Sequence, residues 1–257
     1  ALALELSGRG ARLAISDVNP DGLAETAQRI GSEVHQQVLD VGDRDAVEAY
    51  AAAIAEHFGV VHQLYNNAGI AFSRSVLESE YADYERLFAV NLWGVIHGTK
   101  AFLPHLVASG DGHLINVSSL NGYMAQAQMT HYCTSKFAVR GFTESVRMEM
   151  LRDALPVQVS CVHPGGIKTN IANAAMERAR ELGLPVTEAE ERRRKLYNEK
   201  LLRMDPAQAA RIIVGGVEAG RPRILVGNDA RIVDLLVRLT PSRYPRVAIA
   251  LDRLADR

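Results

Sequence analysis

Hydrophobic positions along the chain form short apolar runs that alternate with longer stretches of helical spacing. The short runs predict six β-strands, at Arg12 to Ser16, Val34 to Leu39, Gln63 to Tyr65, His113 to Val117, Val157 to Val162 and Ile224 to Val226. The longer stretches predict helices at Asp21 to Ile30, Arg44 to Phe58, Tyr81 to Leu106, Tyr132 to Leu151 and Pro206 to Ala219. Such alternation is typical of a parallel sheet wrapped by helices, so we predict a doubly wound α/β fold in a single domain, residues 1–257.

The start of the chain, ALALELSGRGARLAISD, predicts a helix from Ala1 to Leu6 followed by a strand that ends at Asp17. No Ser, Thr, Asp or Asn precedes this helix to cap its free N–H groups. We therefore expect that part of the first structural unit lies upstream of Ala1, and a lost leader stays open.

Composition and charge narrow the class of protein. With 257 residues, 47% of them apolar and 23% charged, the chain can bury the core of one sizeable globular domain. A formal net charge of −1 provides no positive field for nucleic acid, and no apolar run is long enough to predict a membrane span. The two cysteines are too few for a disulfide framework, and no Cys/His cluster has metal-site spacing. We expect a cytoplasmic protein without nucleic-acid, membrane or metal partners.

Polar or small residues follow almost every predicted strand, where doubly wound sheets bind ligands. They are Asp17, Asp40, the NNAG segment at 66–69, the serines at 118–119 and the HPGG segment at 163–166. A carboxylate in the position of Asp17 accepts hydrogen bonds from the adenosine ribose and repels a 2′-phosphate, which favours NAD over NADP. Alternatively, Asp17 only opens the turn DVNPDG and caps the next helix, which Asn19 or Asp21 could cap equally well.

The segment YCTSK places Tyr132 and Lys136 four residues apart, on one face of a predicted helix. An ammonium group beside a phenol lowers the phenol pKa and makes the pair suitable for acid/base chemistry. Ser119, at the end of a predicted strand, is expected in the same crevice. Asn91 is a poor helix former in an apolar neighbourhood, so it requires either a structural partner or a function.

These motifs, in this order and spacing, resemble the short-chain dehydrogenases/reductases in their single-domain form, from Ala1 to near Val226. The resemblance implies a Rossmann-type fold and four catalytic residues: Asn91, Ser119, Tyr132 and Lys136. It also implies a cofactor site made by Asp17, Asp40, Val41, Asn67, Ala68, Gly69, Tyr132, Lys136, Pro164, Gly165, Ile167 and Thr169. In the family, the counterparts of Asp40 and Val41 flank the adenine ring, and the segment HPGGIKT closes over the nicotinamide.

The resemblance also accounts for the unusual start. In this family, a first strand and a glycine-rich TGxxxGxG turn precede a helix similar to ALALELSGRGA. We therefore expect the sequence to lack that strand, which is central in the family's sheet, so that its two neighbours lose their shared partner.

By resemblance, the activity is reversible hydride transfer between a nicotinamide cofactor, preferably NAD, and a small-molecule secondary alcohol or ketone. Ser119 would hold the substrate oxygen, and Tyr132 would donate or remove the proton. Lys136 would lower the pKa of the tyrosine and bind the nicotinamide ribose. Asn91 would order a water molecule on the path of the proton. Residues 171–204 would form a lid over a substrate of low polarity, and residues 228–257 would form a C-terminal extension. The protein would assemble as a homodimer or homotetramer. The alternatives are a non-catalytic NAD-binding sensor or scaffold, an inactive truncated fragment, or an epimerase or dehydratase of the extended branch.

Overall fold

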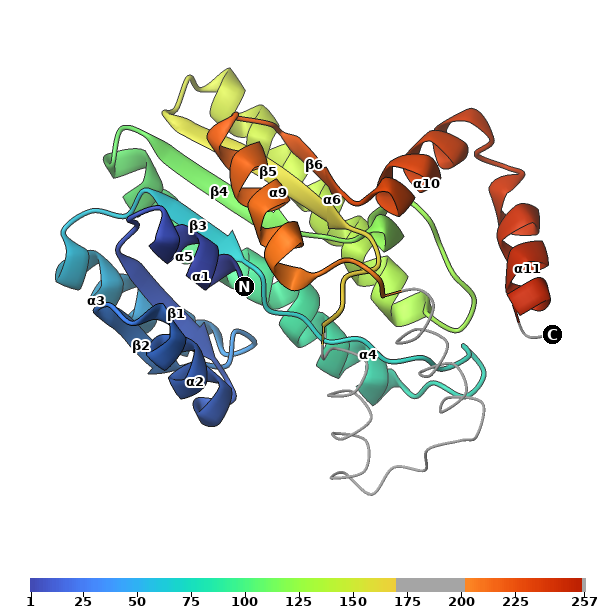
Figure 1. The fold of residues 1–257 in the computed structure, drawn as a ribbon, viewed down its shortest axis with the longest axis horizontal. Helices are drawn as coiled ribbons and strands as arrows, with labels where there is room; N and C mark the ends of the chain where they lie inside the picture. Colours follow the sequence, from blue (N-terminus) through green and yellow to red (C-terminus); the bar gives the residue numbers. More distant parts are fainter. Residues whose placement is uncertain (170–201, 256–257) are drawn as a thin grey trace.

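The computed structural model describes residues 1–169 and 202–255 (Figure 1). The strands are β1 (Leu13–Asp17), β2 (Val34–Val38), β3 (Gln63–Asn66), β4 (Gly112–Val117), β5 (Val157–Pro164) and β6 (Arg223–Val226). The helices before β4 are α1 (Leu2–Gly8), α2 (Pro20–Ile30), α3 (Arg44–Phe58), α4 (Tyr81–Phe88), the π-helix η1 (Ala89–Trp93) and α5 (Gly94–Ala108). Those after it are the 3₁₀-helix η2 (Leu120–Gly122), α6 (Thr130–Arg152), α9 (Pro206–Glu218), α10 (Asn228–Leu239) and α11 (Tyr244–Ala255).

All strand pairs in the described part of the chain are parallel, which confirms the predicted α/β class. The strands form two sheets, one of order β1-β2 and one of order β3-β4-β5-β6. No ladder joins β1 to β3 among the described residues. β1 and β3 are the two strands that we expected to lack a shared neighbour. The upstream strand itself stays a prediction.

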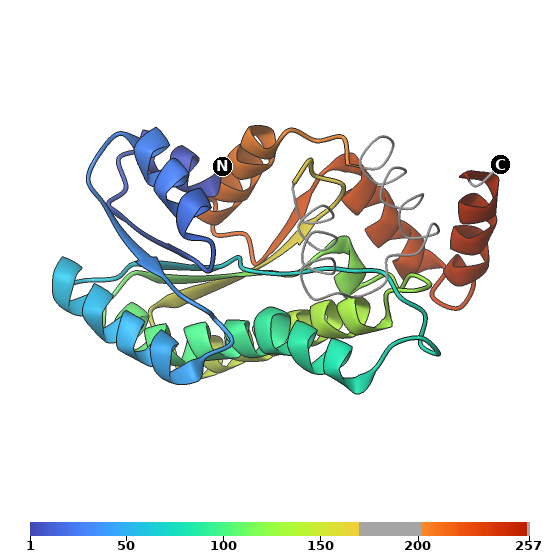
Figure 2. The ribbon, with the colours of Figure 1, turned by 90° about the horizontal axis from the view of Figure 1, so that it is seen from below.

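Helices cover both faces of the strands, as the view along the sheet shows (Figure 2). On one side lie α1, α2 and α9, and on the other lie α3, α5 and α6 (Figures 1 and 2). The largest buried cluster packs α9 against β4, β5 and β6 through Ile115, Val162, Ile213 and Ile224. Further clusters lie under α3 and α5 and under α6, so that the core extends along both faces of the four-stranded sheet.

Local capping explains where several helices begin. The side chain of Asn19 accepts hydrogen bonds from the N–H groups of Asp21 and Gly22 at the start of α2. Asp43 caps α3 in the same way, and Gly59 ends that helix in the left-handed conformation. The predicted helix Arg44 to Phe58 is confirmed at both ends.

The predicted single helix from Tyr81 to Leu106 is wrong in its middle. The segment is divided into α4, the π-helix η1 and α5. A π-helix inserts an extra residue into a turn and turns the following side chains, a distortion that is frequent at functional sites. Here the distorted turn contains Asn91.

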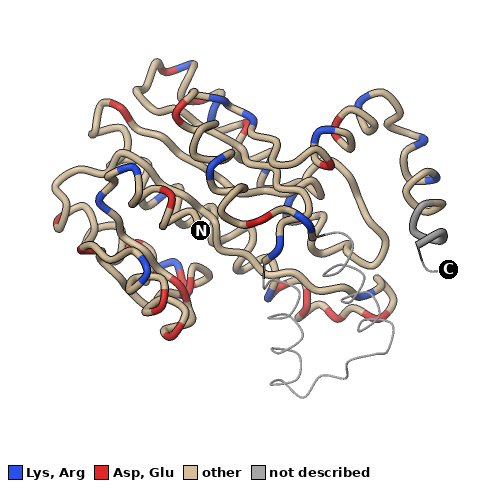
Figure 3. Tube along the Cα trace, in the orientation of Figure 1, with Lys and Arg blue, Asp and Glu red and all other residues tan. Residues whose placement is uncertain are grey.

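Charged side chains of both signs are distributed along the described chain (Figure 3). No described helix is long and apolar enough to cross a bilayer. Within residues 1–169 and 202–255, no group of three or more His, Cys, Asp or Glu side chains is arranged to hold a metal ion.

The predicted C-terminal extension consists of α10 and α11, at the end of the molecule farthest from α3 (Figure 1). Residues 171–201 of the predicted lid lie outside the described residues. Met204, at its end, forms an isolated parallel bridge with Ile167.

Candidate active site

The first two turns of α6 bring Tyr132 and Lys136 together, as their spacing predicted. The Lys136 ammonium nitrogen lies 5.8 Å from the centre of the Tyr132 ring and donates a hydrogen bond to the carbonyl of Val117, at 3.0 Å. Lys136 is only 4% exposed, and burial lowers the pKa of its ammonium to about 8. One carbonyl contact leaves further N–H donors of this ammonium for a bound ligand.

Ser119 follows β4 and caps the short helix η2. Its hydroxyl oxygen accepts a hydrogen bond from the N–H of Asn121, at 3.1 Å, and the residue is 8% exposed. The Asn121 amide in turn donates to the sulfur of Cys133, at 3.3 Å, and Cys133 directly follows Tyr132. The turn that carries Ser119 is therefore attached to α6 beside Tyr132.

Asn91 has a structural partner. Its side-chain oxygen accepts from the N–H of Ile70 at 2.8 Å, and its amide donates to the Ile70 carbonyl at 2.9 Å. The amide also donates to the hydroxyl of Ser135, which itself donates to the carbonyl of Tyr132. Asn91, which is fully buried, therefore joins the segment after β3 to the first turns of α6.

The NNAG segment at 66–69 lies close to Asn91 and Lys136. Asn66 lies in a polar network across the sheet, in which its amide donates to the side-chain oxygen of Asn116 at 2.8 Å. Asn67 and Ala68 are exposed. A Cβ atom added at Gly69 would lie 3.4 Å from the Asn91 oxygen and 3.5 Å from the Lys136 nitrogen, so the glycine keeps open the space beside both groups.

The residues predicted for the adenosine end lie apart from this cluster, at the ends of β1 and β2. Asp17 is exposed, and its carboxylate accepts the N–H of Asn19 at 2.9 Å. Asp17 therefore opens the turn, and the cap of the following helix is Asn19 and not Asp17. Asp40 similarly accepts the N–H of Gly42, at 2.8 Å. Neither contact tests the predicted preference for NAD.

Val41, the other predicted adenine contact, packs against η1 and α5. A Cβ atom at Gly94 would lie 2.6 Å from a Val41 methyl carbon, so this approach requires glycine. The Val41 carbonyl also lies 3.1 Å from a ring nitrogen of His97.

The loop after β5 contains the last set of predicted cofactor residues. Pro164 ends the strand, and the N–H of Gly165 donates to the carbonyl of Val226 at 2.9 Å. Ile167 pairs with Met204, whereas Thr169 is exposed.

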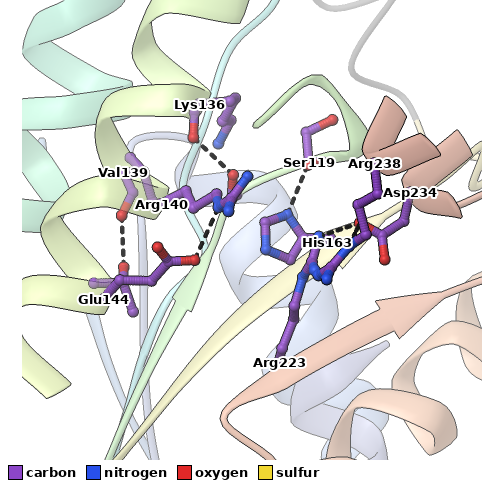
Figure 4. Close-up of polar contacts among 11 residues, drawn as sticks. Ser119, Lys136, Val139, Arg140, Glu144, His163, Arg223, Asp234 and Arg238 are labelled. Atoms are coloured by element: carbon purple, nitrogen blue, oxygen red, sulfur yellow. Dashed lines mark hydrogen bonds and ion pairs between the residues drawn. The ribbon is translucent and has the colours of Figure 1, made fainter. Parts of the chain in front are cut away.

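Two side chains around this loop were not assigned a role from the sequence. His163, one residue before Pro164, is fully buried and contacts Ser119 (Figure 4). Asp229, after β6, contacts Gly166. The rule that ligand-site residues follow parallel strands could have found Asp229, because the segment GND comes directly after Val226.

Comparisons with known proteins identify the family of this chain. A family model described as short chain dehydrogenase matches residues 1–180. The Mycobacterium tuberculosis protein SadH, named as an oxidoreductase, is 49% identical over 255 residues, which cover 97% of this chain and 89% of SadH. Mouse estradiol 17-beta-dehydrogenase 11 is 27% identical over 249 residues, covering 95% of this chain and 76% of that protein.

A solved structure shows the same fold. It is a short chain dehydrogenase/reductase from Burkholderia phymatum in complex with NAD, and it matches with a TM-score of 0.83 at 26% identity. The match covers 97% of this chain and 89% of that one. The chain therefore belongs to the short-chain dehydrogenase/reductase family of oxidoreductases.

Proposed function

We propose that this protein transfers a hydride between a nicotinamide cofactor and a secondary alcohol or ketone of low polarity. The observation that carries the proposal is the buried Lys136 ammonium at 5.8 Å from the Tyr132 ring, next to the turn that holds Ser119. This arrangement supplies a proton donor or acceptor, a cation beside it and a hydroxyl group for the substrate oxygen.

The described residues fit a nicotinamide cofactor at its reactive end. Gly69 leaves space beside Lys136, and the Lys136 ammonium has N–H donors in addition to the one that contacts Val117. We assign Lys136 and the loop from Pro164 to Thr169 to the nicotinamide riboside, and Asp17, Asp40 and Val41 to the adenosine. When bound, the nicotinamide supplies or accepts the hydride. The Burkholderia structure with NAD supports this assignment, and Asp17 supports a preference for NAD.

Ser119 is arranged to donate to the substrate oxygen. A serine hydroxyl has one proton and two lone pairs, and the contact with the Asn121 N–H uses a lone pair. The proton therefore remains available for the substrate. Tyr132 delivers or removes the proton at that same oxygen, and the positive charge on Lys136 favours the tyrosinate form.

Asn91 contributes through the segment that it holds. Because both ends of its amide bind Ile70, it fixes the position of the NNAG segment beside Lys136. Ordering a water on the path of the proton to solvent is the further role that we propose for it.

The proposed substrate class, a secondary alcohol or ketone of low polarity, is supported by one relative. The mouse relative is named for a lipophilic secondary alcohol, which supports the same class here. We propose a cytoplasmic homodimer or homotetramer as the working form.

The experiment that tests the function measures NADH and NADPH oxidation with a panel of lipophilic ketones, and cofactor binding by fluorescence. We expect turnover by the wild-type chain, none by Tyr132→Phe with nearly unchanged cofactor affinity, and a loss of both in Lys136→Ala. Equal turnover in Tyr132→Phe and wild type would contradict the proposal, and cofactor binding without turnover of any ketone would indicate a sensor.

A further inference from the structure

The carboxylate of Asp229, at the start of α10, reaches the loop that follows β5. One of its oxygens accepts the N–H of Gly166 at 2.6 Å, and the other accepts the N–H of Ala230 at 2.9 Å. A Cβ atom at Gly165 or at Gly227 would collide with this carboxylate. Two glycines, one on each segment, thus leave the space that the Asp229 side chain occupies.

Gly166 is also held from its other side. Its carbonyl accepts the N–H groups of Arg203 and Met204, both at 3.0 Å. The position of the loop is thus determined by α10 together with the segment that leads into α9.

The same turn of α10 holds the Ser119 side of the site. The carbonyl of Ala230 accepts a hydrogen bond from the hydroxyl of Tyr123 at 2.7 Å. Tyr123 directly follows η2, and Ser119 is the N-cap of η2. Asp229 and Ala230 therefore bind both loops through adjacent residues.

His163 joins the two loops directly. Its ring nitrogen Nδ1 donates to the carbonyl of Ser119 at 2.9 Å (Figure 4). Its ring centre lies 5.1 Å from that of Tyr123. Burial lowers the pKa of His163 to about 4, so the ring is neutral at pH 7 and its one N–H is the one that the carbonyl needs.

An ion pair anchors α10 to the sheet. The guanidinium of Arg223, on β6, binds the carboxylate of Asp234, on α10, at 2.5 Å (Figure 4). It also lies 5.2 Å from the centre of the Tyr123 ring. Asp234 is only 14% exposed at its side chain, so this pair is screened less than a surface pair. The first turn of α10 consequently starts from a fixed position.

We propose that Asp229 is a positioning residue for hydride transfer. Through Asp229 and Ala230, the first turn of α10 sets the position of the nicotinamide loop relative to the serine that holds the substrate oxygen. This inference rests on the proposed function, in which loop 164–169 contacts the nicotinamide. A displacement of about 1 Å between reacting groups can lower a rate about a hundredfold, so a contact that does not touch the reactants can still control turnover.

The test compares three variants. Asp229→Ala removes the contact with Gly166, and Asp229→Asn keeps one oxygen that can accept it. Asp205→Ala is the matched control, because the Asp205 carboxylate also accepts two backbone N–H groups, at 2.8 and 3.2 Å, but both belong to its own helix α9. The readouts are amide hydrogen exchange of residues 165–168, kcat and KM, and the primary isotope effect with deuterated cofactor.

We expect Asp229→Ala to speed exchange at Gly166 and to lower kcat about tenfold or more, with a changed isotope effect. Asp229→Asn should restore most of the slow exchange at Gly166 and most of kcat. Asp205→Ala should lower the melting temperature without changing the exchange of the loop or the isotope effect.

Unchanged exchange at Gly166 in Asp229→Ala, or an equal loss of kcat in Asp229→Ala and Asp205→Ala, would overturn the proposal. Absence of turnover by the wild-type chain would refute the proposed function instead. The exchange measurement would then decide by itself whether Asp229 holds the loop.

Discussion

The two sheets differ in how deeply they are buried. In the four-stranded sheet, every residue of β4 from Gly112 to Asn116 is buried, and most of β5 is buried as well. In the two-stranded sheet, neither β1 nor β2 has a buried residue, and α1, which lies on the same side of the molecule as α2, has none. The same kind of parallel pairing is thus well packed in one region and partly open to solvent in the other.

The difference in burial between the two sheets matches the two parts of the candidate site, the proposed reacting end and the proposed adenosine end. Ser119, Tyr132, Lys136 and Asn91 are held by the well-packed region or by helices that cover it, whereas Asp17 and Asp40 lie at the ends of the exposed strands. Groups that move a proton must be fixed to within a fraction of an ångström, because misplacement lowers the rate steeply. Contacts to the adenosine tolerate more freedom, since they contribute binding rather than chemistry.

The largest effect is expected at the reacting end. Tyr132→Phe removes the proposed proton donor. General acid–base catalysis contributes about a hundredfold to ten-thousandfold, so kcat should fall by at least that range. Steady-state assays at saturating cofactor measure it. Tyr65→Phe is the control, because its hydroxyl contacts Gln63, outside the site. A kcat for Tyr132→Phe within a factor of three of wild type would exclude the tyrosine as the acid.

A pair of core substitutions compares the packing of the two sheets. Ile115→Ala, at a fully buried position of β4, should lower the free energy of unfolding by about 2–5 kcal/mol. Ile15→Ala, at a half-buried position of β1, should cost less than about 2 kcal/mol because less contact is lost. Urea unfolding followed by circular dichroism measures both. Equal losses would mean that the exposed sheet is as tightly packed as the buried one.

Acid should destabilise the four-stranded region through three buried histidines. Burial lowers the pKa values of His113, His131 and His163 to about 4, from 6.5 in the unfolded chain. Between pH 6.5 and 4, the unfolded chain therefore binds protons that the folded chain does not, and stability falls as the pH falls. The loss should be about 1–3 kcal/mol for each histidine.

Urea midpoints between pH 8 and 4 measure this dependence. His113→Asn, which keeps a donor for the hydroxyl of Ser160, should flatten the curve, whereas replacing the exposed His62 with Asn should leave it unchanged. Identical curves for His113→Asn and wild type would contradict the histidine explanation.

The smallest effect is expected at the adenosine end. Asp17→Ser removes the negative charge that would repel a 2′-phosphate, so the ratio of NADPH to NADH affinity should rise about tenfold, or about 1.4 kcal/mol. Fluorescence titration with both cofactors measures the ratio, and Asp21→Ser, on the same exposed turn, is the control. An unchanged ratio would leave Asp17 only its role in the turn, where it accepts the Asn19 N–H.

The sequence predicted what depends on local interactions. The helix Arg44 to Phe58 has its predicted bounds because Asp43 and Gly59 terminate it, and Tyr132 and Lys136 share a face because they are one turn apart. The pattern did not predict the π-helix at Asn91, because the bonds between Asn91 and Ile70 that accompany it join residues 21 positions apart.

Taken alone, the sequence predicted the six strands, most of the helices before β6 and the parallel α/β class, since caps, apolar periodicity and helical spacing act over a few neighbouring positions. The residues proposed for the reacting end came from the resemblance of its motifs to the short-chain dehydrogenases/reductases. The tertiary structure alone decided the burial of His163 against Ser119 and the contact between Asp229 and Gly166. That contact joins residues 63 positions apart, and its partners meet only because β5 and β6 pair in parallel and bring their carboxyl ends to the same edge of the sheet.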